Sequence, residues 1–169
     1  DPLDPNAHDD GAPASADDTP ALVPETAPVD TSAAVGGYSA ATREAAAHLA
    51  KGCARFERRE WAEALKAFRA VVAVDRSSSS SKAWLAISAA EFQMNGGKHC
   101  EAQYVPLRHG IKRDPKNASA YTNLGGVQQH ARKDPAKAEE SFREAIRLAP
   151  KFVNAHWNYS GLLYRRRTR

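Results

Sequence analysis

The amino-acid sequence predicts an all-α protein in which antiparallel helix pairs stack into a solenoid. Apolar residues recur at steps of three and four, which is the period of an α-helix. One such pattern occurs three times, and the small residues that lie in the helix before it recur every 35–37 residues: Gly52, Ser88, Gly125 and Ser160. A period near 34–37 residues with two helices per unit is typical of a helical solenoid.

Residues 1–38 are predicted to form a disordered acidic arm rich in proline and alanine. This segment holds eight acidic residues and no lysine or arginine, whereas the rest of the chain holds all 24 basic residues. Its few bulky apolar side chains cannot bury enough surface to offset the entropy of ordering. The arm ends just after Gly36–Gly37. We therefore predict a repeat domain over residues 39–169, with the arm as a solubilising linker.

The clearest copy of the pattern lies in the segment KAEESFREAIRLAP, residues 137–150. Ala138, Phe142 and Ala145 follow one another at steps of four and three, so they share one face of a helix. Pro150 cannot continue that helix because it lacks an N–H group and disfavours helical geometry in the residue before it. Two alanines beside a phenylalanine predict close contacts with neighbouring helices.

Two earlier segments repeat this spacing. The first copy runs through Ala64, Phe68, Val71 and Arg76, and the second through Gln103, Leu107, Gly110 and Pro115. Each copy follows another apolar helix, which carries the small residue where the paired helix is expected to cross. The sequence thus predicts seven helices, over residues 39–57, 61–75, 81–94, 99–112, 117–131, 135–148 and 152–166.

The second unit departs from the pattern at its start, in its internal turn and within its second helix. Its internal turn, MNGGKH, is longer than in the other units, and Pro106 falls inside its second helix. A proline within a helix costs around 3 kcal/mol, so we expect a kink or a late start there. The serine run at residues 77–81 replaces the usual proline turn and is predicted to cap the helix that carries Trp84.

These residues together resemble a tetratricopeptide repeat (TPR) array over about residues 40–166. The best unit carries Tyr121, Leu124, Gly125, Ala138, Phe142, Ala145 and Pro150; the first carries Gly52, Ala64 and Phe68, and the second Trp84 and Pro115. The resemblance implies a right-handed solenoid of about three units. The seventh helix then has no partner in this sequence. It either ends the array imperfectly or indicates further repeats or a bound partner, and we favour the last two.

The resemblance also implies a concave groove, lined by the first helix of each pair, that holds a peptide or a partner helix. Asn123 and Asn158 lie two residues before the small residue of the last two units, where the first two units have Ala50 and Ala86. An asparagine can pair with a peptide backbone in any sequence because it both donates and accepts. This arrangement is similar to the asparagine ladder of O-linked N-acetylglucosamine transferases and kinesin light chains. The other predicted groove residues are Lys82, Thr122, Gln129, His130, Asn154, Trp157 and Tyr164.

Trp157 and Tyr164 are predicted to dominate binding if they are exposed, and to belong to the core if they are buried. A different TPR function is not supported. Arrays that grip the C-terminal carboxylates of heat-shock chaperones need a lysine and an asparagine where this chain has Leu49 and Cys53. Ala86, Ser119 and Asn123 do not match the remaining clamp positions, and a register one unit later fails at Leu85 and Ala89.

The sequence predicts no enzyme, no cofactor and no metal site. It contains no zinc-protease helix, no glycine-rich phosphate loop and no serine nucleophile elbow. His99, Cys100 and His109 have unconvincing spacing for a metal site, and Cys53 and Cys100 are expected to be reduced, packed thiols. No apolar run approaches the roughly 20 residues of a membrane-spanning helix, so no membrane insertion is expected.

The function predicted from these observations is a scaffold or adaptor that binds another protein. One alternative is the targeting region of a larger enzyme, such as a glycosyltransferase. A second alternative is a basic nucleic-acid-binding module, because the repeat domain is basic and ends in YRRRTR. Two segments, NAS at 117–119 and NYS at 158–160, fit the N-glycosylation pattern. We expect neither to be modified, and favour a cytoplasmic or organelle-interior location.

Overall fold

The computed structural model describes residues 40–74 and 80–168, and every element within these ranges is helical. The predicted arm and most of the serine run lie outside the described residues. The elements are α1 (Ala40–Glu57), α2 (Trp61–Val74), α3 (Ser80–Met94), the 3₁₀ helix η1 (Glu101–Gln103), α4 (Tyr104–Arg113), α5 (Ala118–His130), α6 (Pro135–Leu148) and α7 (Val153–Arg167). The seven predicted α-helices are thus confirmed, with most ends within one or two residues of prediction.

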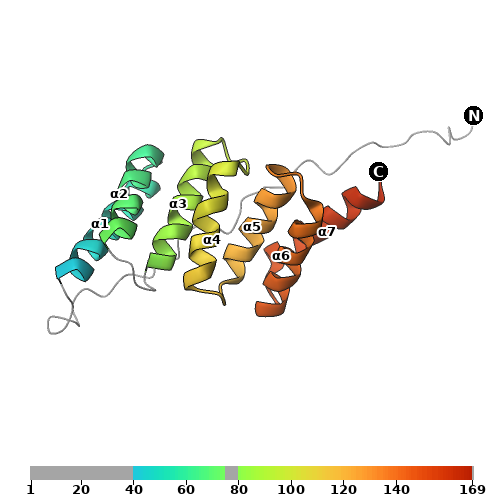
Figure 1. The fold of residues 1–169 in the computed structure, drawn as a ribbon. Helices are drawn as coiled ribbons and strands as arrows, with labels where there is room; N and C mark the ends of the chain where they lie inside the picture. Colours follow the sequence, from blue (N-terminus) through green and yellow to red (C-terminus); the bar gives the residue numbers. More distant parts are fainter. Residues whose placement is uncertain (1–39, 75–79, 169) are drawn as a thin grey trace, which may run out of the picture.

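The helices stand side by side in chain order, as Figure 1 shows, and form a solenoid of helix pairs. Each α-helix packs mainly against its neighbours in the chain, and α5 also contacts α7 directly. The predicted all-α solenoid is therefore confirmed. No helix among the described residues combines the length and the apolar character that crossing a bilayer requires.

Two pairs of helices cross closely because a glycine faces a phenylalanine. A Cβ added to Gly125 would lie only 2.5 to 2.8 Å from three ring atoms of Phe142, and one added to Gly52 would clash with Phe68 in the same way. Both phenylalanines are fully buried. The small residues predicted at these crossings are therefore sites that a larger side chain would disrupt.

The second pair crosses differently because Ser88 stands where the other units have glycine. Gln103 takes the position that Ala64 and Ala138 hold in the other two copies of the pattern, and it is fully buried. Its amide nitrogen donates to the backbone oxygen and to Oγ of Ser88, at 3.2 Å each. A polar contact between α3 and η1 thus replaces the ring-on-glycine contact of the other pairs.

The predicted start of the helix at 99–112 was wrong, but the effect expected from Pro106 was right. Residues 99 and 100 are not helical, residues 101–103 form η1, and α4 begins only at Tyr104. Pro106 then lies in the first turn of α4, where its missing N–H would have no partner within the helix. The late start expected from this proline is confirmed.

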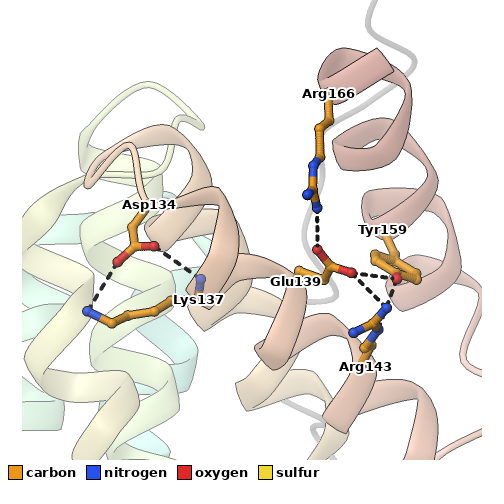
Figure 2. A network of polar contacts seen from close by, with 6 residues as sticks. All are labelled: Asp134, Lys137, Glu139, Arg143, Tyr159 and Arg166. Carbon is orange, nitrogen blue, oxygen red and sulfur yellow. Dashed lines mark hydrogen bonds and ion pairs between the residues drawn. The ribbon is translucent and has the colours of Figure 1, made fainter.

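Side-chain caps define the starts of α5 and α6, the two helices of the last complete pair. Asn117 accepts a hydrogen bond from the backbone N–H of Ala120 at 3.1 Å and begins α5. Asp134 accepts one from the N–H of Lys137 at 3.1 Å and begins α6 (Figure 2). That bond, together with the Lys137 ammonium, lowers the pKa of the Asp134 carboxyl, so the charged cap is retained well below neutral pH.

The glycine crossings lead to a test with a matched control. Gly125→Ala should lower the free energy of unfolding by about 1–3 kcal/mol, because Phe142 and α6 must shift to admit the methyl group. Gly161→Ala in α7 should instead stabilise the protein by about 0.5–1 kcal/mol, because alanine favours a helix more than glycine. Apart from the two adjacent residues and the nearby backbone of α7 itself, no described atom lies within 4 Å of the Cβ that this change adds. Urea unfolding of both variants checks this, and equal midpoints would contradict the close crossing.

Candidate functional site

An open pocket lies between α5 and α7, at the end of the solenoid. The space between its lining residues is about 350 Å³ when the open solvent at its mouth is included, and we call this shallow site the α5–α7 pocket. Its lining residues are His99, Gly126, Gln129, His130, Phe142, Trp157, Asn158, Gly161 and Arg165. Four residues predicted for the groove (Gln129, His130, Trp157 and Asn158) therefore come together in one place.

Helix periodicity explains which residues face the pocket. Gly126, Gln129 and His130 lie three and four residues apart on α5, so they share one face. Asn158, Gly161 and Arg165 lie at steps of three and four on α7 and do the same. Phe142, which packs on Gly125 from α6, lines the pocket as well.

His99 reaches the pocket through the long turn of the second unit. Gly96 and Gly97 have positive φ angles of 66° and 72°, a conformation that glycine adopts readily, and they reverse the chain after α3. The His99 ring then lies 5.2 Å from that of Phe92 and is stacked 6.0 Å from that of His130. It covers Gly126 so closely that an added Cβ would clash with three of its ring atoms.

Gln103 fixes which nitrogen of His99 carries a proton. The Gln103 amide nitrogen donates to Ser88, so its oxygen Oε1 is the atom that faces Cys100 and His99. Oε1 accepts from the backbone N–H of Cys100 at 3.0 Å and lies 3.3 Å from His99 Nδ1. Because an amide oxygen only accepts, Nδ1 must be the donor. A buried glutamine thus orients a histidine of the pocket.

A polar network between α6 and α7 fixes the orientation of α7 (Figure 2). Glu139 of α6 accepts from Arg166 at 3.0 Å and from the hydroxyl of Tyr159 at 3.2 Å, both residues of α7. Arg143 pairs with Glu139 at 2.8 Å, and its Nε donates to the Tyr159 hydroxyl at 3.0 Å. Arg166 is therefore held by α6.

Its neighbour Arg165 has no such partner. This side chain is exposed and lines the α5–α7 pocket. Within residues 40–74 and 80–168 it forms no hydrogen bond and no ion pair. The network that holds Arg166 therefore leaves one unpaired guanidinium group beside the pocket.

Trp157 and Tyr164 are surface residues. Their side chains are 59% and 70% exposed, among the most exposed large apolar side chains of the described residues. Of the two alternatives left open by the sequence, the structure excludes the core, because both rings lie at the surface. Both lie on α7, seven residues apart, and therefore on the same side of the helix.

The other predicted groove residues are placed less favourably for contact. Asn123 is 3% exposed and Thr122 2% exposed, and the Thr122 hydroxyl donates to the backbone oxygen of Ala118 at 3.0 Å. Asn123 makes no side-chain hydrogen bond to any described residue. Lys82 is exposed and Asn154 half-buried, and neither lines the pocket. Of the two predicted ladder residues, only Asn158 lines it.

Five pocket residues were not predicted as groove residues: His99, Gly126, Phe142, Gly161 and Arg165. The unusual turn with two adjacent glycines was visible in the sequence and could have indicated that its last residues fold back. Arg165 could have been selected because it lies four residues after Gly161 and seven after Asn158. Nothing in the run of arginines, however, distinguishes Arg165 from Arg166 without the position of Glu139.

The histidines of the metal site considered from the sequence, His99 and His109, pack against different residues. His109 stacks on Trp84 at 4.5 Å, whereas His99 packs on Phe92 and His130. The described part of the chain contains no group of three or more histidine, cysteine or acidic side chains arranged to hold a metal ion. Cys53 and Cys100 are free thiols, both half-buried. Burial, and secondarily Glu57, raises the pKa of the Cys53 thiol, which keeps it protonated at neutral pH.

Comparison with known proteins places this fold among repeat domains. Residues 49–95 match the family model of the tetratricopeptide repeat. The TPR domain of Arabidopsis OM64 superposes with a TM-score of 0.64 at 17% identity, covering 72% of this chain and 96% of that one. The first TPR domain of Spaghetti (RPAP3), bound to the HSP90 peptide SRMEEVD, gives a TM-score of 0.64 at 14% identity, covering 72% and 92%. No curated protein matches the chain.

The Gln103 network can be tested by removing its hydrogen bonds at similar volume. Gln103→Leu should lower the free energy of unfolding by about 1–3 kcal/mol, because it leaves the N–H of Cys100 without its acceptor. Gln93→Leu is the matched control, since the half-buried Gln93 side chain bonds to no described residue. Chemical denaturation measures both, and a control that loses as much stability as Gln103→Leu would argue against the network.

Proposed function

We propose that this chain, whose residues 49–95 match the tetratricopeptide-repeat model and whose fold resembles that of TPR domains, is a non-catalytic adaptor. Its ligand is an extended peptide segment of another protein, bound across the α5–α7 pocket and along α7. TPR domains are generally interaction modules without catalysis, and a similar domain, that of Spaghetti (RPAP3), carries a bound peptide. The HSP90 peptide bound by that domain does not indicate the partner of this chain, because the positions of the clamp for chaperone tails hold other residues here.

The observation that carries the proposal is the exposure of Trp157 and Tyr164 beside a polar pocket. Large aromatic side chains contribute most of the binding energy in many interfaces, because they bury much area at little entropic cost. Here two of them, 59% and 70% exposed, flank Asn158, Gly161 and Arg165 of the pocket. A ligand that covers the rings would gain apolar burial and polar contacts together.

The spacing of the two rings fits an extended chain. Seven residues of α-helix span about 10.5 Å along its axis. An extended peptide advances about 3.3 Å per residue, so three residues of ligand cover that distance. In a polyproline II conformation, side chains three residues apart also point the same way. One short segment can therefore place two apolar side chains on Trp157 and Tyr164.

Two amide side chains of the pocket can pair with the ligand backbone. Gln129 and Asn158 each offer an N–H donor and a carbonyl acceptor, and both line the pocket. This revises the ladder expected from the sequence: Asn158 and Gln129 act from opposite helices, while the buried Asn123 lies beneath the surface. Backbone pairing of this kind would hold a peptide without fixing its sequence.

Nucleic-acid binding is the second candidate, and the structure adds an observation in its favour. Exposed aromatic rings next to cations are the elements of a single-strand stacking platform, and Tyr164 is followed directly by Arg165–Arg167. Such binding would weaken steeply as the salt concentration rises. A bound peptide held mainly by apolar burial would be much less sensitive to salt.

The proposal is tested by selecting ligands from a phage library of random peptides of about a dozen residues against the full chain. Trp157→Ala should weaken the selected peptides about 30-fold, because a buried hot-spot residue contributes about 2 kcal/mol or more. Val105→Ala is the matched control, since Val105 is 57% exposed but lies on α4, away from the pocket. Fluorescence anisotropy of labelled peptides measures the affinities.

The outcomes separate the two candidates. Selected peptides that bind equally well to Trp157→Ala and to the Val105→Ala control would contradict binding at α7. Failure to enrich any peptide, with salt-sensitive binding of a single-stranded oligouridylate, would replace the adaptor proposal by the nucleic-acid alternative.

A further inference from the structure

The lining of the α5–α7 pocket contains no carboxylate. Its nine residues include two histidines and one arginine, together with the amides of Gln129 and Asn158. The pocket therefore presents N–H donors and positive charge, while the apolar rings of Trp157 and Tyr164 lie at its edge and beyond it. This is the composition of a site for an anionic group.

The carboxylates near the pocket are already occupied by other cations. Glu139 is paired with Arg143 and Arg166 and accepts from Tyr159. Glu101, which follows the pocket residue His99 by two positions in the chain, is paired with Arg132. Neither acid is available to Arg165, since each is already paired with a neighbouring residue.

Arg132, which follows His130 by two residues, makes a second contact besides this ion pair. Arg132 lies over the Tyr104 ring at 4.0 Å, in addition to its ion pair with Glu101. Of the arginines near the pocket, Arg132 and Arg166 thus serve the fold. Arg165, which has no hydrogen-bond or ion-pair partner among the described residues, is the one that can serve a ligand.

We infer that the α5–α7 pocket selects a peptide with an anionic side chain, which Arg165 binds while neighbouring apolar residues of the peptide cover Trp157 and Tyr164. This inference rests on the proposed function and names its ligand class. A guanidinium group offers a planar fork of donors that matches a carboxylate or a phosphate. The amides of Gln129 and Asn158 supply further donors to the remaining oxygens.

This site differs from a clamp for C-terminal carboxylates. The clamp positions lie on α1, α3 and α5, the first helix of each pair. In this chain they hold Leu49, Cys53, Ala86, Ser119 and Asn123. The anion site instead combines α5, α7 and the turn that carries His99. It requires no free chain end, so an internal aspartate, glutamate or phosphorylated residue satisfies it.

The experiment uses the peptides selected against the full chain. Acidic residues should be enriched at one position, next to apolar positions. For the best peptide, replacing that acid by its amide should weaken binding at least about tenfold, since a charge-assisted contact is lost. A phosphoserine version distinguishes the two sources of the anion: whichever of glutamate and phosphoserine binds more tightly to the unmodified chain is the preferred group.

Arg165→Gln should weaken the acidic peptide about tenfold and leave its amide version nearly unchanged. Arg167→Gln is the matched control, because Arg167 is also exposed and unpaired within the described residues but lies outside the pocket. It removes the same charge from the same helix end. Its effect should stay within about twofold, as expected for a screened surface charge.

Each result bears on a different statement. If no acid is enriched, or if Arg165→Gln and Arg167→Gln weaken the acidic peptide equally, the anion site is refuted. The adaptor proposal still holds in that case, provided that Trp157→Ala weakens the selected peptides about 30-fold while Val105→Ala does not. If no peptide binds at all, both statements fail together.

Discussion

The close crossing of each first helix with its partner is the contact on which the remaining architecture depends. Where Gly125 faces Phe142, the missing side chain lets the ring settle against the backbone of α5. The same ring continues through to the α5–α7 pocket and forms part of its lining. One phenylalanine therefore sets the distance between two helices and closes the inner side of the candidate site. A change at Gly125 would alter the fold and the pocket together.

The second unit shows what happens when this contact is replaced. Ser88 cannot admit a ring as glycine does, and Gln103 compensates with hydrogen bonds from a fully buried position. A buried amide must satisfy its oxygen as well as its nitrogen, and the oxygen turns toward Cys100 and His99. The irregular turn of this unit is thereby connected to the pocket of the next one. An exception to the repeat has become part of the site.

Sequence periodicity predicted the helices well because burial of one face depends on local spacing. Ala138, Phe142 and Ala145 are fully buried as their spacing indicated, and Pro106 delayed α4 as expected. The site was predicted less completely, because accessibility depends on contacts between distant segments. Asn123 and Asn158 hold equivalent repeat positions, yet only Asn158 lines the pocket. His99 reaches it through two positive φ angles, which the sequence permits but does not specify.

The arginines of α7 illustrate how one network divides similar residues between stability and recognition. Glu139 lies 27 residues before Arg166 and selects it by geometry, so that Arg166 fixes α7 on α6. Because this contact holds α7 in one orientation on α6, the adjacent residue Arg165 faces the pocket. A surface cation contributes little to stability by itself, so leaving it unpaired costs little. It becomes useful only when a ligand excludes water from it, because the same charge then acts in a lower dielectric. The pair Glu139–Arg166 is thus what would give the neighbouring Arg165 a defined place in binding.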